Sequence, residues 1–345
     1  MKKLLKIFSV SIASLTLCAS SIMPQVSAVS SNTENNKSLS QKAKDFILNH
    51  KGELGFGTAA LASTVALFKI LSTENVDVER YINSSGNLEV AADKWFERLG
   101  GTQEDIKKYN EDVLKISSQE EKLGKDFEQI GHDVLRTFFK EKDVQKNQKM
   151  LSNILKVWQL NNVNLKRHYI QGMNDYGEFI LLKFCENHTE YAEAKAYYVF
   201  TKTMEAVYNN YIEVATDTNY MVTNNGKKIK GRITNCFSKK EKSDFYDLVN
   251  LFTNQMEFGS LFLINPILMC ALRLYTYEES VKIWDQIILD DKITTKKGFN
   301  LNNFQKVMDA IIGKKILDVY STSGVNIKKL NEDDFQKLSN LYNGK

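Results

Sequence analysis

Proline is almost absent from this chain. The 345 residues include only two prolines, Pro24 and Pro266. Proline disrupts helix interiors because it lacks an N–H donor and clashes with the preceding turn, so its scarcity permits long helices. The 17 glycines are also few, which argues against a fold of short strands and glycine-rich turns. We therefore expect an all-α fold, in a chain long enough for one large domain or two modest ones.

Cysteine, histidine and net charge each exclude a further class of protein. The four cysteines have no close spacing, so they predict neither a disulfide framework nor a zinc site. The four histidines follow no metal-ligand pattern. Part of the net charge of +4 comes from three lysines in the first six residues, so nothing demands a nucleic-acid partner. A GxxxxGK[ST] phosphate loop is also missing from the sequence, so we expect no nucleotide or metal cofactor bound by the chain itself.

The first 28 residues have the pattern of a secretory signal peptide. They combine a lysine-rich start, an apolar stretch from Ile7 to Ala19, and small residues at Val26 and Ala28 that fit a cleavage site. An uncleaved N-terminal anchor is the alternative. Residues 29–50 begin with a serine- and asparagine-rich stretch and are expected to form a linker. The sequence thus predicts a secreted protein.

Residues 51–90 form an apolar N-terminal segment. The run from Leu54 to Phe68 contains no charged residue, but it is shorter than the roughly 18 apolar residues that a membrane span requires. Extending it to Leu71 brings it closer to that length. Two interpretations stay open: a helix or hairpin packed on the main domain, and a segment that contacts a membrane through Leu54–Leu71.

The rest of the chain has helical periodicity of its apolar residues. Helices are predicted over residues 143–160, 191–215, 277–290, 301–320 and 331–342, and over 244–275, where Pro266 should end one helix and start another. Aromatic residues at helical spacing within 191–215 are expected to lie in the core. Residues 217–243 are polar and carry several lysines, which predicts a long surface loop. Docking of an acidic partner or of lipid is a second interpretation of that loop.

Two short segments, 35 residues apart at Arg136 and Gln171, contain residue types that can act on a nucleotide. The first is Ile130-x-x-Asp133-x-x-Arg136. Taken alone it predicts a helix turn, with Ile130 and Leu135 in the core and Asp133 paired with Arg136. The second is Tyr-Ile-Gln-Gly-Met-Asn-Asp, residues 169–175. Taken alone it predicts a helix start, with a glycine in a tight turn and a solvated glutamine.

Together, the two segments resemble the signature of the TBC domain, which activates the GTPase of Rab proteins. The matching positions are Ile130, Asp133 and Arg136, then Tyr169 and Gln171 followed by Gly-Met-Asn-Asp. Lys-Ile-Trp-Asp at 282–285 resembles a later segment of the family, and Trp95 with Leu99-Gly100 resembles an early one. The resemblance implies a multi-helix, TBC-like domain of two helical subdomains over 91–295, followed by C-terminal helices over 296–345. The family usually has a proline before the arginine, at the position that Leu135 or Val134 occupies in this chain.

The resemblance also implies a role for each residue. Arg136 would be an arginine finger and Gln171 a glutamine finger, both supplied in trans to a Rab-family small GTPase that binds the GTP and Mg²⁺ itself. Asp133 would hold Arg136, and Tyr169 would set the loop that carries Gln171. The same resemblance includes Ile130 and Gly172 as supporting residues.

A leader on a protein that acts on Rab GTPases requires an explanation, because Rab GTPases are cytosolic. A bacterial protein exported and delivered into a host cell, where it redirects vesicle traffic, reconciles the two features. Two alternatives come from other classes of protein. One is a catalytically silent helical module that captures a GTPase or a scaffold, and the other is a secreted, membrane-active helical protein that uses Leu54–Leu71.

Overall fold

We describe a computed structural model of the chain. It describes residues 79–82, 90–137, 143–187, 189–212, 232–234, 236, 243–245, 248, 272–325 and 332–342. Contacts divide the chain into two units, residues 1–75 and residues 76–345. All described residues belong to the second unit, so the predicted leader, linker and Leu54–Leu71 segment lie outside them.

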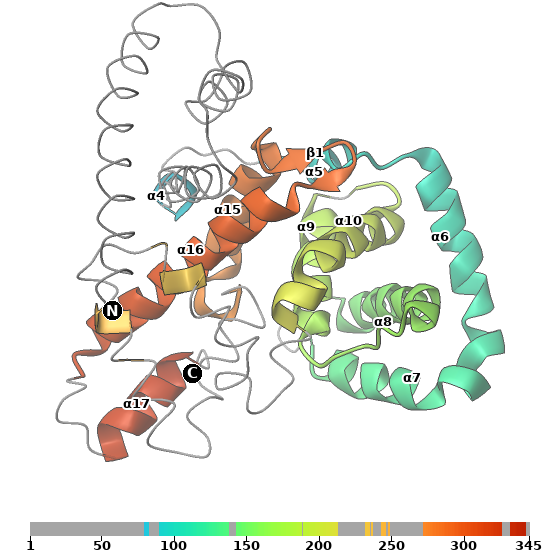
Figure 1. The fold of residues 1–345 in the computed structure, drawn as a ribbon. Coiled ribbons are helices and arrows are strands. Elements are labelled where there is room, and N and C mark those ends of the chain that lie inside the picture. Colours follow the sequence, from blue (N-terminus) through green and yellow to red (C-terminus); the bar gives the residue numbers. More distant parts are fainter. Residues whose placement is uncertain are drawn as a thin grey trace, which may run out of the picture. The chain divides into compact units, whose positions relative to one another are not determined.

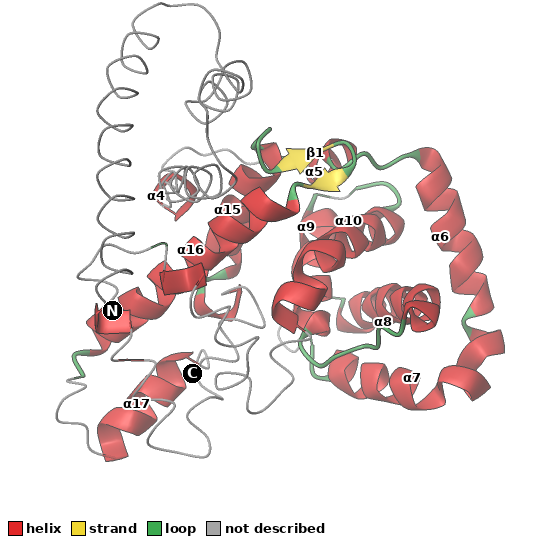
Figure 2. Ribbon diagram, in the orientation of Figure 1, coloured by secondary structure: helices red, strands yellow, loops and turns green. Residues whose placement is uncertain are grey.

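Helices dominate the described part of the chain (Figures 1 and 2). The longer ones are α5 (Ala92–Arg98), α6 (Gln103–Lys115), α7 (Glu120–Leu135), α8 (Val144–Asn162), α9 (Met173–Glu186), α10 (Ala192–Val207), α15 (Tyr277–Leu289), α16 (Leu301–Ser323) and α17 (Glu332–Tyr342). The shorter ones are α4 (Glu79–Ile82), η1 (Ser117–Gln119), η2 (Val163–Leu165), η3 (Tyr208–Ile212) and η4 (Leu272–Leu274). The all-α prediction is confirmed. The two described strands, β1 (Thr294–Thr295) and β2 (Gly298–Phe299), form one antiparallel hairpin.

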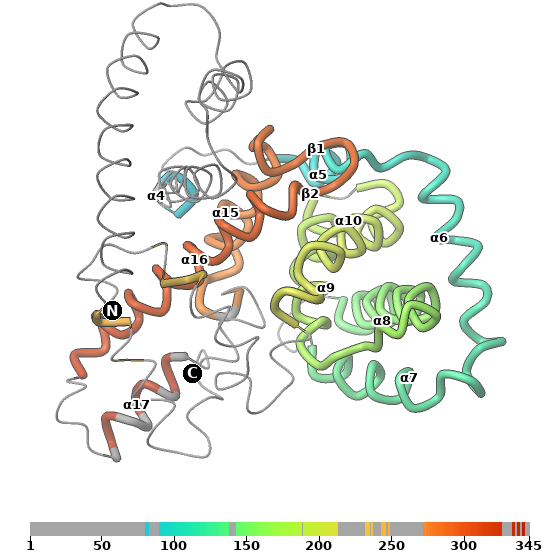
Figure 3. Tube along the Cα trace, viewed as in Figure 1, coloured from blue at the N-terminus to red at the C-terminus, as the bar shows by residue number. Residues whose placement is uncertain are grey.

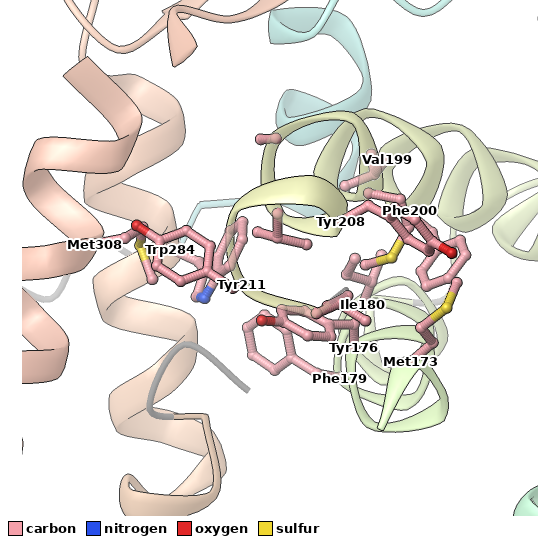
Figure 4. Close-up of a cluster of buried hydrophobic side chains, with 14 of the residues drawn as sticks. Met173, Tyr176, Phe179, Ile180, Val199, Phe200, Tyr208, Tyr211, Trp284 and Met308 are labelled. Carbon is pink, nitrogen blue, oxygen red and sulfur yellow. The ribbon is translucent and has the colours of Figure 1, made fainter. Parts of the chain in front are cut away.

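The helices α8, α9 and α10 pack against one another, and α7 packs against both α8 and α9 (Figure 3). Their inward faces are fully buried, with aromatic and aliphatic side chains at helical spacing such as Trp158, Tyr176 and Phe200. Figure 4 shows this core from α9 and α10 to Trp284 of α15 and Met308 of α16. Burial of such large side chains supplies most of the stability of a helical domain.

A buried ion pair joins three helices that are far apart in sequence. The Nζ atom of Lys183 on α9 lies 3.6 Å from an Asp285 carboxylate oxygen on α15, and both side chains are buried. The indole Nε1 of Trp95 on α5 donates to the other oxygen at 2.6 Å. Burial raises the pKa of Asp285, while Lys183 and the Trp95 bond lower it. These contacts hold α9, whose first turn follows Gln171, against the early and late parts of the fold.

Five predicted helices have counterparts among the described residues, in α8, α10 with η3, α15, α16 and α17, and the predicted helical segment 244–275 lies mostly outside them. Two predictions need correction. Leu135, expected in the core, is 65% exposed, because the helix ends there and its side chain falls on the outer face. Residues 232–234, expected within a long loop, are helical, and Arg232 forms an ion pair with buried Asp309 at 2.8 Å. Among the described residues, none of the helices has the length and hydropathy to cross a membrane.

Candidate functional site

Arg136 lies at the point where helix α7 ends. Its backbone remains in the right-handed helical region as the C-cap residue. One guanidinium nitrogen, Nη2, donates to Asp133 one turn earlier, and Nε donates to the His132 carbonyl at 3.3 Å. The Arg136 side chain is 60% exposed, whereas that of Asp133 is 2% exposed. The predicted pair therefore exists, and the buried carboxylate holds one edge of an otherwise exposed guanidinium.

The carboxylate of Asp133 is shared between the two motif segments. One oxygen accepts from Arg136, and the other accepts from the Tyr169 hydroxyl at 2.9 Å and from Gln129 Nε2 at 3.1 Å. Burial and the nearby Asp133 charge raise the pKa of the Tyr169 phenol well above its ordinary value, so it stays protonated as a donor. The arginine segment and the glutamine segment thus meet on one buried carboxylate.

Gln171 stands on a turn that is fixed on both sides. Tyr169 precedes it and is anchored to Asp133. Gly172 follows it with φ +105°, a left-handed conformation that glycine adopts without the strain of a side chain. The Gly172 N–H donates to Asn174 Oδ1 at 3.0 Å, in the first turn of α9. The Gln171 side chain is exposed, and within the described ranges it makes no hydrogen bond.

A second set of hydrogen bonds closes a ring between the two segments. Asn174 Nδ2 donates to Thr137 Oγ1 at 3.3 Å. Thr137 Oγ1 in turn donates to the main-chain carbonyl of Asp133 at 2.7 Å. Asp133 is therefore linked to the Gln171 turn from both of its ends, through Tyr169 on one side and through Asn174 on the other. Such a closed network limits how far the two segments can move apart.

Helix α8 supports the end of α7, where Arg136 lies. The Nε2 atom of Gln148 lies 3.3 Å from the Val134 carbonyl and 3.4 Å from those of Leu135 and Thr137. The last carbonyls of a helix have no partner within the helix, so a side-chain donor there stabilises the helix end. Gln148 fixes the main chain on both sides of Arg136.

Sequence reasoning found part of this arrangement. Four of the six predicted site residues, Asp133, Arg136, Tyr169 and Gly172, are tied into one network. Ile130 is fully buried in the core, and Gln171 is exposed on the turn between the anchors. The catalytic roles stay predictions, because geometry alone does not test them.

The bridging roles of three further residues were missed. Thr137 directly follows Arg136, and Asn174 lies three residues after Gln171, so their position next to the signature residues was an available signal. No sequence signal marked Gln148, because an amide on an amphipathic helix resembles any solvated residue. Its role depends on how α8 packs against the end of α7.

The described residues contain no group of three or more histidine, cysteine or acidic side chains that could hold a metal ion. The fold and site define a class of protein: a helical scaffold that holds an exposed arginine and an exposed glutamine on coupled turns. A family model, the Rab-GTPase-TBC domain, matches residues 93–300. That is more than half of the chain, so the chain belongs to the Rab-GTPase-TBC domain family. No curated protein and no solved structure matches it.

Membership of this family defines the general activity and the partner class. TBC domains act on Rab GTPases and accelerate their GTP hydrolysis, so the partner is a small GTPase. The matched range begins just before Trp95 and ends after the β hairpin. It includes Arg136, Gln171 and every residue of the network around Asp133.

Proposed function

We propose that this chain accelerates GTP hydrolysis on a Rab-type GTPase by supplying Arg136 and Gln171 in trans. The observation that supports this most strongly is the Asp133 carboxylate, which binds the arginine segment and the glutamine segment at once. Two catalytic groups from separate segments must keep a fixed spacing to act on one phosphate. A shared, buried anchor is a direct way to set that spacing.

Arg136 has the properties that an arginine finger requires. Charge on the γ-phosphoryl oxygens grows in the transition state of hydrolysis, and a guanidinium from a partner stabilises it by about 10³–10⁵ in rate. That range corresponds to about 4–7 kcal/mol. The guanidinium of Arg136 uses two of its nitrogens on Asp133 and His132, and the exposed remainder of its five N–H donors can bind phosphate oxygens.

Gln171 has the matching properties for positioning water. Its amide both donates and accepts, so it can bind the attacking water and a phosphate oxygen together. The glutamine is exposed while the residues on both sides of it are anchored. This combination gives a free side chain on a fixed backbone, which lowers the loss of conformational entropy when the partner binds.

The test is single-turnover GTP hydrolysis across a panel of Rab GTPases, with the full chain and with Arg136→Ala and Gln171→Ala. We expect acceleration on at least one Rab, a loss of about 10³-fold or more for Arg136→Ala, and about 10²-fold for Gln171→Ala. Lys107→Ala and Gln103→Ala, which remove a charge and an amide from the exposed face of α6, are the matched controls. Nucleotide-dependent binding without acceleration would instead identify a catalytically silent capture module.

We also propose that the chain is exported and acts on the GTPase of a host cell. The support is the signal-peptide pattern of residues 1–28 ahead of a domain whose partners are cytosolic. Expression in a bacterial host, followed by N-terminal sequencing of the culture-medium protein, should show a chain that begins at residue 29. Retention of the full-length chain in the cells would contradict export.

A further inference from the structure

The loop before Gln171 is held by two buried side chains that lie outside the two motif segments. The hydroxyl of Tyr208 accepts from the His168 N–H at 3.1 Å and donates to the His168 carbonyl at 3.0 Å. The amide oxygen of Gln159 accepts from the Tyr169 N–H. Three successive polar groups of the loop main chain are therefore bonded to residues of α8 and η3.

Tyr208 is the first residue of η3, a π-helical turn that follows α10. Single π turns inside or at the end of helices are uncommon and occur often at functional sites. The Tyr208 ring is 4% exposed and packs on Trp158 of α8, with ring centroids 5.5 Å apart. Because the ring is fixed by this packing, its hydroxyl has a defined position against the loop.

Gln159 presents an unusual use of a buried amide. The residue is fully buried, and its Nε2 finds no hydrogen-bond partner in the described part of the chain. A buried donor without a partner destabilises a fold, so an apolar residue would serve better if packing were the sole requirement. What glutamine adds at this position is the acceptor for the Tyr169 N–H.

We propose that Tyr208 and Gln159 are positioning residues that set where Gln171 stands relative to Arg136. The proposal rests on the proposed function and deepens it. Gln171 follows Tyr169 by two residues, so the main chain that Tyr208 and Gln159 hold leads directly into the glutamine turn. Tyr169 is then fixed twice, at its hydroxyl by Asp133 and at its N–H by Gln159.

Tyr208→Phe in the full chain is the sharpest test, because it removes one hydroxyl and keeps the packed ring. The matched control is Tyr211→Phe, in the same π turn. The Tyr211 hydroxyl bonds to Asp309 at 2.9 Å instead of to the loop. Figure 4 shows Tyr208 beside Phe200 and Tyr211 on the side of Trp284 and Met308.

We expect Tyr208→Phe to lower kcat for the GTP hydrolysis that the chain stimulates on the Rab about tenfold with KM unchanged, since small misplacements of a catalytic group reduce rate strongly. Tyr211→Phe should keep kcat within about twofold, as expected of a bond remote from the reacting groups. In a Gln171→Ala background, Tyr208→Phe should cause no further fall in kcat. An equal fall in both backgrounds would overturn the proposal, because Tyr208 would then act on general stability. Gln159→Leu, which removes the acceptor at similar volume, should give the same pattern as Tyr208→Phe.

Hydrogen exchange of the loop provides a readout that needs no GTPase. Exchange in a peptide that covers residues 166–172 should rise about tenfold in Tyr208→Phe, because the His168 amide loses its acceptor. It should stay unchanged in Tyr211→Phe. Unchanged exchange in Tyr208→Phe would overturn the positioning role. If the wild-type chain accelerates no Rab, the proposed function fails, and the exchange result alone decides whether Tyr208 holds the loop.

Discussion

Asp133→Asn should separate the two roles of the shared carboxylate. The asparagine oxygen can occupy the position that now accepts from Tyr169 and Gln129. The asparagine NH₂ then faces the Arg136 guanidinium, and two donors repel one another. The substitution should therefore release Arg136 while it keeps the link to the glutamine segment.

The expected magnitudes follow from the exposure of the two partners. Arg136 is 60% exposed, so its ion pair resembles a surface pair and its loss should cost the fold about 1 kcal/mol or less. The loss of transition-state stabilisation should be larger than this loss of folding stability. An arginine side chain without its carboxylate partner loses rotamer entropy when it binds phosphate, which costs up to about 2 kcal/mol. That corresponds to a fall of up to about 30-fold in kcat.

The assay is GTP hydrolysis by the Rab, stimulated by the chain at saturating GTPase, with thermal unfolding measured in parallel. We expect a clear fall in kcat with little change in melting temperature. In an Arg136→Ala background, Asp133→Asn should have almost no further effect on kcat. Wild-type kcat in Asp133→Asn, or a fall in kcat by the same factor in both backgrounds, would refute the role of Asp133 in holding Arg136.

Four further outcomes are expected. Tyr169→Phe should lower the free energy of unfolding in a denaturant titration by about 1.5–3 kcal/mol, because a buried bond to a carboxylate is lost. Leu135, next to the arginine, is exposed in the chain alone. If the bound GTPase covers this side chain, Leu135→Ser should raise KM for the GTPase about tenfold. An unchanged KM would exclude Leu135 from that interface. Lys183→Met should destabilise the fold by about 3–5 kcal/mol, because Asp285 keeps a buried charge. Burial raises the pKa of Asp285 above its ordinary value, and loss of the lysine raises it further. The deficit should therefore grow as the pH rises through the folded-state pKa that Asp285 has in the wild type, and a deficit independent of pH would contradict that. Gly131→Ala should raise the free energy of unfolding by about 0.5–1 kcal/mol, and with it the melting temperature, because the added methyl meets open space within α7.

The helices were predictable because they depend on local information. Periodic apolar residues along α8 and α15 determine which face is buried, and that periodicity is visible in the sequence. The end of α7 was harder to predict. Leu135 continues the apolar pattern, but the helix stops there and leaves the leucine outside. Where a helix ends depends on contacts such as the Gln148 bonds to its last carbonyls, which come from another helix.

The site was predictable only where a motif marked it. Asp133 and Arg136 lie one turn apart, so their pairing follows from helix geometry alone. The bond between Asp133 and Tyr169 spans 36 residues, and only the family resemblance connected those segments. Gln159 and Tyr208 belong to no motif, and both reach the loop through packing of α8 against α10 and η3. No local pattern in the sequence marks such residues.

The measurement that tests the central claim most directly uses a responsive Rab whose own water-positioning glutamine is replaced by leucine. If Gln171 acts in trans, the full chain should still accelerate GTP hydrolysis by this variant, because the water is oriented by the activator. Gln171→Ala should remove that acceleration. No acceleration of the leucine variant by the wild-type chain, or equal acceleration by Gln171→Ala, would contradict the account.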